Sequence, residues 1–402
     1  MPFCRRRSLT RLPNLLRTSW LFTPQAYGVD DYKATDYKYH IFVGILHARR
    51  NTYSHHKTTW VKPYFAMTTG HKVAQKIHSK GLAVGSLFAG CGGMDLGFVL
   101  EGFNVAWAND NNHWACETYK KNFGDHVIEG DVTKVDFEKL KKCDVILGGF
   151  PCQDFSMIWK RKGLGTDRGN LYRHFVRSVS TLRPKIFVAE NVKGLLTANE
   201  GKAIKQIMAD FSETGYRVQV HPVNFATYGA PQLRERVLII GVRNDIKDDF
   251  VMPAKTHTPE TYVGAAEAFK GVENALYNNE KLGIQPATIE KLKLIPPGGN
   301  FTDIPRNSPH YVKGMISHVY RRLHPNKPST TIIAGGGGGT WGYHYSEPRP
   351  LTNRERARLF GYPDDFVFVG SVTEVRRQIG NSVPPVAIRV IARALKRFLA
   401  KV

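Results

Sequence analysis

From Leu82 onward the chain alternates between short apolar runs and amphipathic segments, and this alternation most limits its possible fold. Apolar runs such as 82–88 and 185–189 are typical of buried strands. Helical periodicity follows at 113–123 and 171–182. The alternation therefore predicts an α/β fold with a mainly parallel sheet and helices on both faces.

The same patterns divide the chain into parts. Further strands are predicted at 104–108, 144–147, 217–224 and 236–242, and further helices at 94–100, 352–360 and 385–399. The regularity stops near residue 245, after which prolines, glycines and asparagines dominate and only short helical pieces are predicted, such as one at 265–277. We therefore expect four parts: an N-terminal extension at 1–66, an α/β domain at 67–245, a smaller irregular domain at 246–325 and a C-terminal segment at 326–402 that returns to the sheet.

Charge points to the class of partner. Lys and Arg number 57 against 34 Asp and Glu, a net charge of +23, which favours a polyanion and first of all nucleic acid. Residues 1–80 carry 14 of the basic and 3 of the acidic side chains, so the remaining chain is only moderately basic. This basic start is compatible with a DNA-binding arm or a targeting sequence. We expect instead an appended, poorly ordered extension, and the sequence leaves open whether translation starts at Met67.

Cysteine content and hydropathy indicate which cellular compartment and which kinds of site to expect. Five scattered cysteines without a CxxC pair argue against a disulfide framework and against a zinc site, so no metal is expected. No apolar run approaches the roughly 18 residues that a membrane helix needs. We therefore expect a reducing compartment and no membrane partner.

A glycine loop, FAGCGG at 88–93, lies between the first predicted strand and helix, so its amides can face a polar ligand. It lacks the GxGxxG spacing and the lysine of a P-loop, which disfavours a dinucleotide or a nucleoside triphosphate. Asp110, at the end of the second strand, suits ribose hydroxyls, and Asp131, at the end of the third, suits an adenine amino group. Adenosine without a pyrophosphate suggests S-adenosylmethionine.

Cys152 lies in the loop just after the predicted strand 144–147, at the edge where catalytic groups collect in an open sheet. A thiolate there can act as a nucleophile, although an isolated Pro-Cys more often places a small buried apolar side chain. Glu190 ends the strand at 185–189 and, taken alone, would be an ordinary salt-bridge carboxylate. Arg234 and Arg236 are two apart and point the same way in an extended segment.

Six blocks change these odds, because they stand in the order found in one enzyme family. They are SLFAGCGG (86–93), GGFPCQDFS (148–156), AENV (189–192), YGAPQLRERVLIIGVR (228–243), RPLTNRERARLFGYP (349–363) and QIGNSVPP (378–385). From Leu82 to Leu399 the chain resembles the DNA (cytosine-5) methyltransferases of bacterial restriction-modification systems. The resemblance implies a Rossmann-like S-adenosylmethionine-dependent methyltransferase sheet at 67–245, which binds the cofactor and carries catalysis, and a target-recognition domain at 246–325.

The resemblance also implies residue roles. Cys152 would add to carbon 6 of cytosine, and Glu190 would assist at ring nitrogen 3. Arg236 would reach the cytosine carbonyl oxygen, while Arg234 supports the catalytic loop. The implied cofactor site comprises Phe88, Gly90, Gly92, Asp110, Asp131, Val132, Pro151, Leu171, Asn381 and Ser382. Asp110 stands where Glu is commoner, and Asn111 where an aromatic residue is frequent, so we expect cofactor binding to survive with reduced affinity.

A base inside a duplex must be flipped out before it can be attacked. The loop at 153–170, with hinge glycines Gly163 and Gly165, is predicted to close over the flipped base and to grip phosphates. The DNA-binding residues expected are Gln153, Ser156, Lys160, Arg161, Lys162, Arg168, Lys313, Arg321 and Arg322.

The sequence therefore predicts methyl transfer from S-adenosylmethionine to carbon 5 of a flipped cytosine in a specific double-stranded DNA sequence. The expected partners are this DNA and a cognate restriction endonuclease, and the enzyme is expected to be a monomer. The resemblance also implies a location in the bacterial cytoplasm, at the nucleoid. Two alternatives stay open: a related enzyme that methylates tRNA, and a non-catalytic DNA-binding homologue. A nicotinamide-dependent oxidoreductase is disfavoured by the missing glycine fingerprint.

Overall fold

The computed structural model describes residues 81–151, 171–313, 319–335 and 342–402. Two predicted segments lie outside these residues: the extension at 1–66 and the lid at 153–170. Met67 lies outside them too. All described residues belong to one of the two units into which the chain divides, Trp60–Val402.

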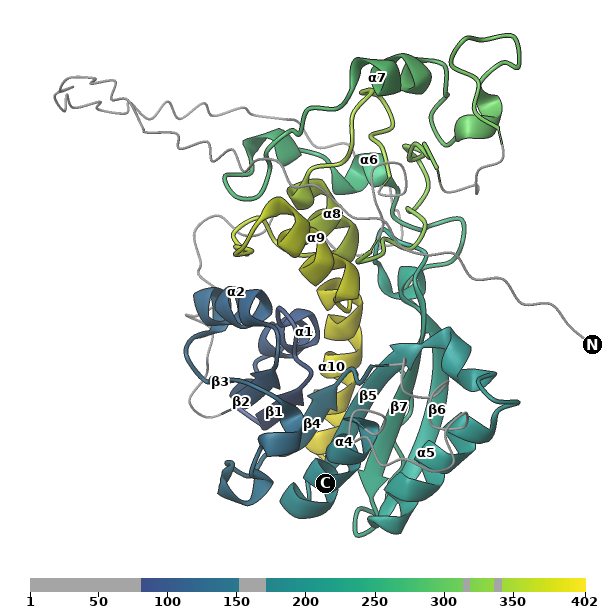
Figure 1. Ribbon diagram of the computed structural model, residues 1–402. Helices are drawn as coiled ribbons and strands as arrows, with labels where there is room; N and C mark the ends of the chain where they lie inside the picture. The colour runs from purple at the N-terminus through teal and green to yellow at the C-terminus, as the bar shows by residue number, and fades with distance from the viewer. Residues whose placement is uncertain (1–80, 152–170, 314–318, 336–341) are drawn as a thin grey trace, which may run out of the picture. The chain divides into compact units, whose positions relative to one another are not determined.

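The described part of this unit contains a seven-stranded sheet (Figure 1). Its strands are β1 (Ala83–Leu87), β2 (Asn104–Asp110), β3 (Val127–Glu129), β4 (Val145–Gly148), β5 (Ile186–Val192), β6 (Tyr216–Asn224) and β7 (Glu235–Arg243). Their order across the sheet is β3-β2-β1-β4-β5-β7-β6. The pairs from β3 to β5 are parallel, whereas β7 runs antiparallel to both β5 and β6. The predicted Rossmann-like α/β fold is confirmed.

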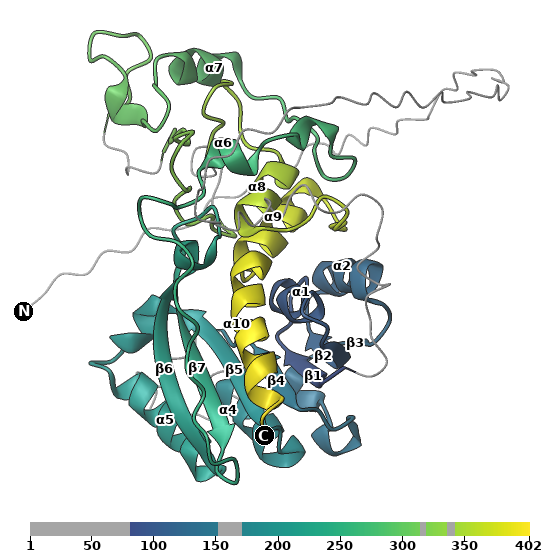
Figure 2. The same cartoon turned by 180° about the vertical axis from the view of Figure 1, so that it is seen from behind.

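Helices cover both faces of the sheet. They are α1 (Gly93–Val99), α2 (His113–Phe123), α4 (Leu171–Leu182), α5 (Lys202–Glu213), α6 (Ala265–Ala268), α7 (Pro286–Lys293), α8 (Asn353–Phe360), α9 (Val372–Asn381) and α10 (Pro385–Leu399). Along β5, Ile186 and Val188 join one core with α1 and α10, while Phe187 and Ala189 join a second core with α4 and α5. Figures 1 and 2 show these two layers from opposite sides. The alternation follows from the two-residue period of a strand.

The last helix, α10, packs onto the sheet domain. α10 lies along α1, where a Cβ on Gly97 would come within 2.6 Å of Ile388 Cγ2. Glu101, just after α1, also pairs with Arg389 and Arg393 of α10 at 2.6 and 2.9 Å. Glycine at position 97 therefore permits the close approach of the two helices.

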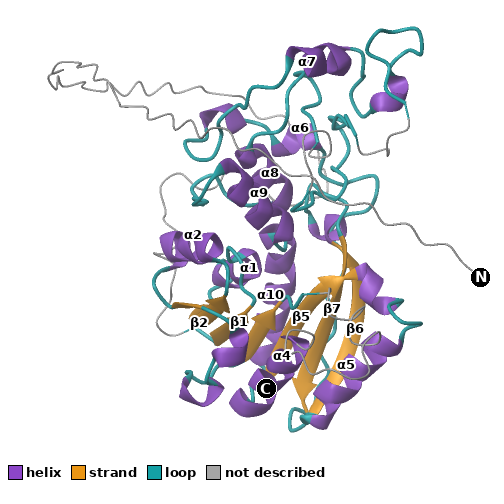
Figure 3. Ribbon diagram, viewed as in Figure 1, coloured by secondary structure: helices purple, strands orange, loops and turns teal. Residues whose placement is uncertain are grey.

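The segment between β7 and α8 is mostly loop with short helices (Figure 3). The prediction of one helix at 265–277 is wrong: α6 ends at Ala268, and Gly271, with φ of 73°, turns the chain into a 3-10 helix at Val272–Asn274. Five buried residues form a small core of their own: Leu292, Ile295, Phe301, Ile304 and Tyr343. Ala265 and Ala268 instead join the main core.

Across the described ranges, no helix is long and apolar enough to cross a membrane.

Candidate active site

The described candidates for catalysis and cofactor binding lie at one edge of the sheet, for a topological reason. Strands β1 to β5 are parallel, so their carboxyl ends share an edge, and the loops that follow them meet there. Because β7 runs the opposite way, it begins at this edge, where Arg236 pairs in register with Val192 at the end of β5. The sheet thus gathers the glycine loop, both aspartates, Pro151, Glu190 and Arg236.

The glycine loop after β1 has an unusual backbone. Phe88, Gly90 and Gly92 have φ of 53°, 55° and 86°, and Gly92 caps the start of α1. At Gly92 a Cβ would collide with Phe123, whereas at Gly90 it would meet nothing within 4 Å. Gly90 therefore faces open space, as a residue beside a ligand must, while Gly92 is held against α2.

Asp110 ties the glycine loop to the second strand. Its Oδ2 accepts from Gly90 N at 2.8 Å and its Oδ1 accepts from Asn112 N at 2.9 Å. Burial raises the pKa of this carboxyl group, although these backbone hydrogen bonds oppose the rise. Each oxygen retains a second lone pair, so the carboxylate can still accept hydrogen bonds from a diol.

Asp131 and Val132 follow β3. Gly130 N donates to Asp110 O at 2.9 Å. This hydrogen bond ties the backbone just before Asp131 to Asp110, the other residue predicted to contact adenosine. Asp131 is exposed and caps a short 3-10 helix by accepting from Thr133 N at 2.9 Å, and hydrogen bonds to Thr133 lower its pKa. Val132 is buried.

The remaining predicted cofactor residues come from three further elements. Ser382, which ends α9, lies against Gly93 at the start of α1, and its Oγ is 2.5 Å from Tyr362 Oη. Asn381 is exposed beside it. Pro151 is exposed after β4, and half-buried Leu171 begins α4. Residues far apart in the sequence thus share the edge that carries the glycine loop.

Glu190 and Arg236 form an ion pair on neighbouring strands, with 2.9 Å between Glu190 Oε1 and Arg236 Nε. Both side chains are largely buried, at 12% and 13% exposure. Burial raises the pKa of Glu190 even though Arg236 and Arg234 oppose the rise. A carboxyl group in these surroundings can hold a proton at a higher pH than an exposed one.

Arg234 has a different environment from Arg236. It is buried, and its Nη1 and Nη2 donate to Ile332 O at 3.1 Å and Gly380 O at 3.0 Å. Its guanidinium also lies 5.1 Å from the centroid of the Phe360 ring, and burial lowers its pKa to about 9. These contacts join the start of β7 to the segment before residue 335 and to α9.

Asn191 is a residue to which the sequence patterns assigned no role. Because side chains alternate along β5, Asn191 points to the face opposite Glu190. Its Nδ2 donates to Phe150 O at 2.9 Å, and its Oδ1 accepts from Val192 N at 2.8 Å. A buried amide therefore holds the backbone two residues before position 152. The sequence feature that could have identified Asn191 as a site residue is its place inside the AENV block.

The chain also brings Glu190 close to this backbone. A Cβ on Gly149 would lie 3.4 Å from Glu190 Oε2, so the carboxylate lies beside the segment that leads from β4 to position 152. Cys152 itself, with Gln153, Ser156, Lys160, Arg161, Lys162 and Arg168, lies outside the described residues.

The three remaining DNA-binding candidates differ in exposure. Lys313 is exposed and Arg321 is half-buried. Arg322 is buried and donates four hydrogen bonds, to the carbonyl oxygens of His344, Leu292, Ile295 and Tyr345, at 2.6 to 3.2 Å. The expectation that Arg322 contacts DNA is therefore corrected: its guanidinium binds backbone carbonyls around the small core.

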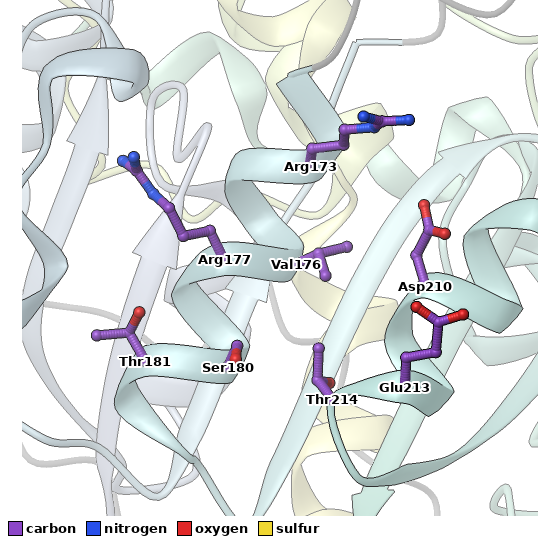
Figure 4. Close-up of a pocket in the computed structure, with 8 residues that line it drawn as sticks. All are labelled: Arg173, Val176, Arg177, Ser180, Thr181, Asp210, Glu213 and Thr214. Atoms are coloured by element: carbon purple, nitrogen blue, oxygen red, sulfur yellow. The ribbon is translucent and has the colours of Figure 1, made fainter.

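Two other clusters contain no predicted site residue. A hollow between α4 and α5 is lined by Arg173, Val176, Arg177, Ser180, Thr181, Asp210, Glu213 and Thr214, none of them a predicted site residue (Figure 4). Elsewhere, His113, Glu117 and Glu129 bring ligand atoms within 4.8 Å of one another. Lys120 Nζ lies 2.9 Å from Glu117 and 3.8 Å from Glu129, so these carboxylates already have a cation of the chain.

Comparison with known proteins identifies the family that the chain matches. Residues 82–397 match the family model of C-5 cytosine-specific DNA methylases. The chain is 58% identical over 318 residues to the Type II methyltransferase M.NgoFVII of Neisseria gonorrhoeae, which covers 77% of this chain and 85% of that protein. It is 41% identical over 344 residues to M.BbvI of Brevibacillus brevis, covering 79% of this chain and 91% of that protein.

Solved structures agree with the fold. A prophage-encoded DNA modification methyltransferase from E. coli aligns with a TM-score of 0.63 at 25% identity, covering 80% of this chain and all of that one. The Dnmt2 methyltransferase of S. pombe aligns with a TM-score of 0.54 at 18% identity, covering 80% of this chain and 99% of that one.

Proposed function

The chain belongs to the C-5 cytosine-specific DNA methylases and is a DNA (cytosine-5-)-methyltransferase of the restriction-modification type; from this premise we propose its donor, its nucleophile and the state of its target base. The donor is S-adenosylmethionine, the nucleophile is Cys152, and the target is a cytosine flipped out of duplex DNA.

The residues at the sheet edge fit S-adenosylmethionine. Open space at Gly90 leaves room for a ligand along the glycine loop, and Asp110, which accepts from Gly90 N, has lone pairs left for a diol. Exposed Asp131 follows the neighbouring strand β3, with the backbone of Val132 after it. When bound, the cofactor supplies an electrophilic methyl group on a sulfonium. The chain binds it, orients it and excludes water.

The cysteine and the carboxyl group act on opposite parts of the cytosine ring. The Cys152 thiolate bonds to carbon 6, the π pair of the carbon 5–carbon 6 double bond shifts into the carbon 4–carbon 5 bond, and the π pair of the carbon 4–nitrogen 3 bond shifts onto nitrogen 3. Glu190 hydrogen-bonds to or protonates nitrogen 3, which offsets the charge that develops there. Its raised pKa, caused by burial, suits a group that donates a proton near neutral pH.

Carbon 5 would then take the methyl group, with S-adenosylhomocysteine as the leaving group. Loss of the carbon 5 proton to water, return of the nitrogen 3 proton to Glu190 and cleavage of the sulfur–carbon 6 bond restore the aromatic ring and release the thiolate. Arg236, already 2.9 Å from Glu190, donates to the cytosine carbonyl oxygen, so both side chains bind one edge of the base. Arg234 stabilises the start of β7 on which Arg236 lies.

The proposed partners are double-stranded DNA and a restriction endonuclease that cleaves the same sequence, with the methyltransferase acting as a monomer. Flipping the base costs a few kcal/mol. The loop at 153–170 and exposed Lys313 would bind phosphates.

One observation carries the proposal: Asn191 and Glu190, adjacent on β5, contact the segment at Gly149 and Phe150 that leads into Cys152. The test is methyl transfer from labelled S-adenosylmethionine to duplex DNA and to tRNA in parallel, followed by sequencing of the modified cytosines. Label in 5-methylcytosine of DNA at one sequence is expected. Label only in tRNA, or in neither, would refute the proposal.

Changing Asn191 should slow catalysis without weakening cofactor binding. Asn191→Asp places a carboxylate oxygen against Phe150 O and removes the buried donor, so the backbone before Cys152 shifts. We expect kcat to fall by about tenfold to a hundredfold, since a small displacement of a reacting group is enough for this. Asn122→Ala removes a comparable buried amide, bonded to Thr118 and Val367, and should leave kcat within about twofold. Equal losses in both variants would contradict the role of Asn191.

Lys313 and Arg322 should give opposite results. Arg322→Met leaves four carbonyls without their donor and should lower the free energy of unfolding by about 2–4 kcal/mol, with little change in the salt dependence of DNA binding. Lys313→Met should change stability by less than about 0.5 kcal/mol but reduce the slope of log K against log salt by about 1. Chemical denaturation and DNA titrations at several salt concentrations measure both. A reduced slope in Arg322→Met alone would restore it as a DNA contact.

A further inference from the structure

Asp95 is a buried carboxylate that the reaction above does not use. It is the third residue of α1 and its side chain is fully buried, with 0% exposure. In the described part of the chain no Lys, Arg or His forms an ion pair with it, and the titratable groups that face it are the hydroxyls of Tyr119 and Tyr362. Such a group is costly to bury, so its contacts need an explanation.

Its two oxygens accept hydrogen bonds from two different elements. Oδ2 accepts from Ser86 Oγ of β1 at 3.0 Å, and Oδ1 accepts from Tyr119 Oη of α2 at 3.0 Å. Ser86 and Tyr119 are themselves buried. Burial raises the pKa of Asp95 to about 6, so at neutral pH it is mainly the carboxylate, which accepts both bonds.

These bonds close the base of the glycine loop. Ser86 lies just before the loop and Asp95 just after it, so their hydrogen bond joins the two stems. Tyr119 joins the same point to α2, whose Phe123 lies directly under Gly92. The upper part of the loop is separately held by Asp110, which accepts from Gly90 N.

We propose that Asp95 is a positioning residue for cofactor binding, because its carboxylate holds the stems of the glycine loop and α2 in the arrangement that the cofactor requires. The inference rests on the proposed function, since it assumes that the loop binds S-adenosylmethionine. Asp95 does not touch the cofactor; it acts through the backbone of residues 88–93.

The test measures affinity for S-adenosylhomocysteine by calorimetry, and kcat and KM for both substrates, in the full chain. Tyr119→Phe and Asp95→Asn each remove one hydrogen bond to the stems. Both should raise the Kd of S-adenosylhomocysteine and the KM of S-adenosylmethionine about tenfold, with kcat and the KM of DNA within about twofold.

Tyr216→Phe is the matched control, because it also removes one buried tyrosine hydroxyl, which donates to Pro184 O at 2.6 Å on the far strand β6. It should lower the melting temperature as Tyr119→Phe does but leave the Kd unchanged. If Asp95→Asn does not fold, Tyr119→Phe and Ser86→Ala decide the matter.

Lower melting temperatures with unchanged Kd in the Asp95, Tyr119 and Ser86 variants would overturn the inference and leave the proposed function intact. A wild-type enzyme that binds no S-adenosylhomocysteine would overturn the proposed function and the inference with it.

Discussion

Cys152→Ser is expected to abolish methyl transfer while leaving cofactor binding intact. A serine hydroxyl is a far weaker nucleophile than a thiolate toward carbon 6, and we expect the rate to fall by at least about a thousandfold. Wild-type enzyme should form a stable covalent complex with DNA that contains 5-fluorocytosine, because the fluorine cannot leave as a proton does. The serine variant should form none, as denaturing electrophoresis will show.

Cys143→Ser is the matched control. Cys143 is a buried cysteine in the second core and has no role in the proposed reaction. The Cys143→Ser variant should keep both activity and the trapped complex. Its thermal unfolding, compared with that of the wild type, checks that it folds. Adduct formation by Cys152→Ser, or its absence in active wild-type enzyme, would refute covalent catalysis by this residue.

Glu190→Gln is expected to have the second-largest effect. The amide keeps the size of the side chain but cannot donate an acidic proton, so kcat should fall by about 10²–10⁴-fold. Glu235→Gln is its control: Glu235 is adjacent to Arg236, but its side chain is exposed and pairs with Lys193 at 2.9 Å. Single-turnover methylation of both variants measures the difference. Full activity in Glu190→Gln would exclude it as the acid.

The pH dependence of the wild-type enzyme has a definite sign. Burial raises the pKa of Glu190, and proton donation requires the protonated form, so kcat/KM should fall as the pH rises through this raised pKa. For the same group, the contribution to stability is present below its unfolded pKa and is lost as the pH rises through the folded one. Glu190→Gln should flatten this limb of the rate profile.

Local patterns were sufficient for much of the fold. Helices at His113–Phe123, Leu171–Leu182 and Pro385–Leu399 have the predicted limits, because amphipathic periodicity and clear end signals coincide there. The helix predicted at 265–277 failed because Gly271 takes a positive φ, which periodicity cannot reveal. No pattern marked α9, whose start is capped by Ser371.

For the site, too, some features follow from local sequence and others arise only from tertiary packing. Strand ends placed Asp110, Asp131 and Glu190 at one edge, since the edge follows from parallel topology. The burial of Arg322 could not be predicted, because its four carbonyl partners come from segments that only tertiary packing brings together. The same holds for Asp95, whose partners Ser86 and Tyr119 lie on separate elements.

The close packing of α10 on α1 has a consequence for synthesis on the ribosome. α10 comes long after α1 in the sequence, so during synthesis the apolar face of α1 stays exposed until α10 has left the exit tunnel. A chain truncated before α10 cannot complete this layer. Newly made protein therefore covers α1, next to the glycine loop, only once α10 has been made.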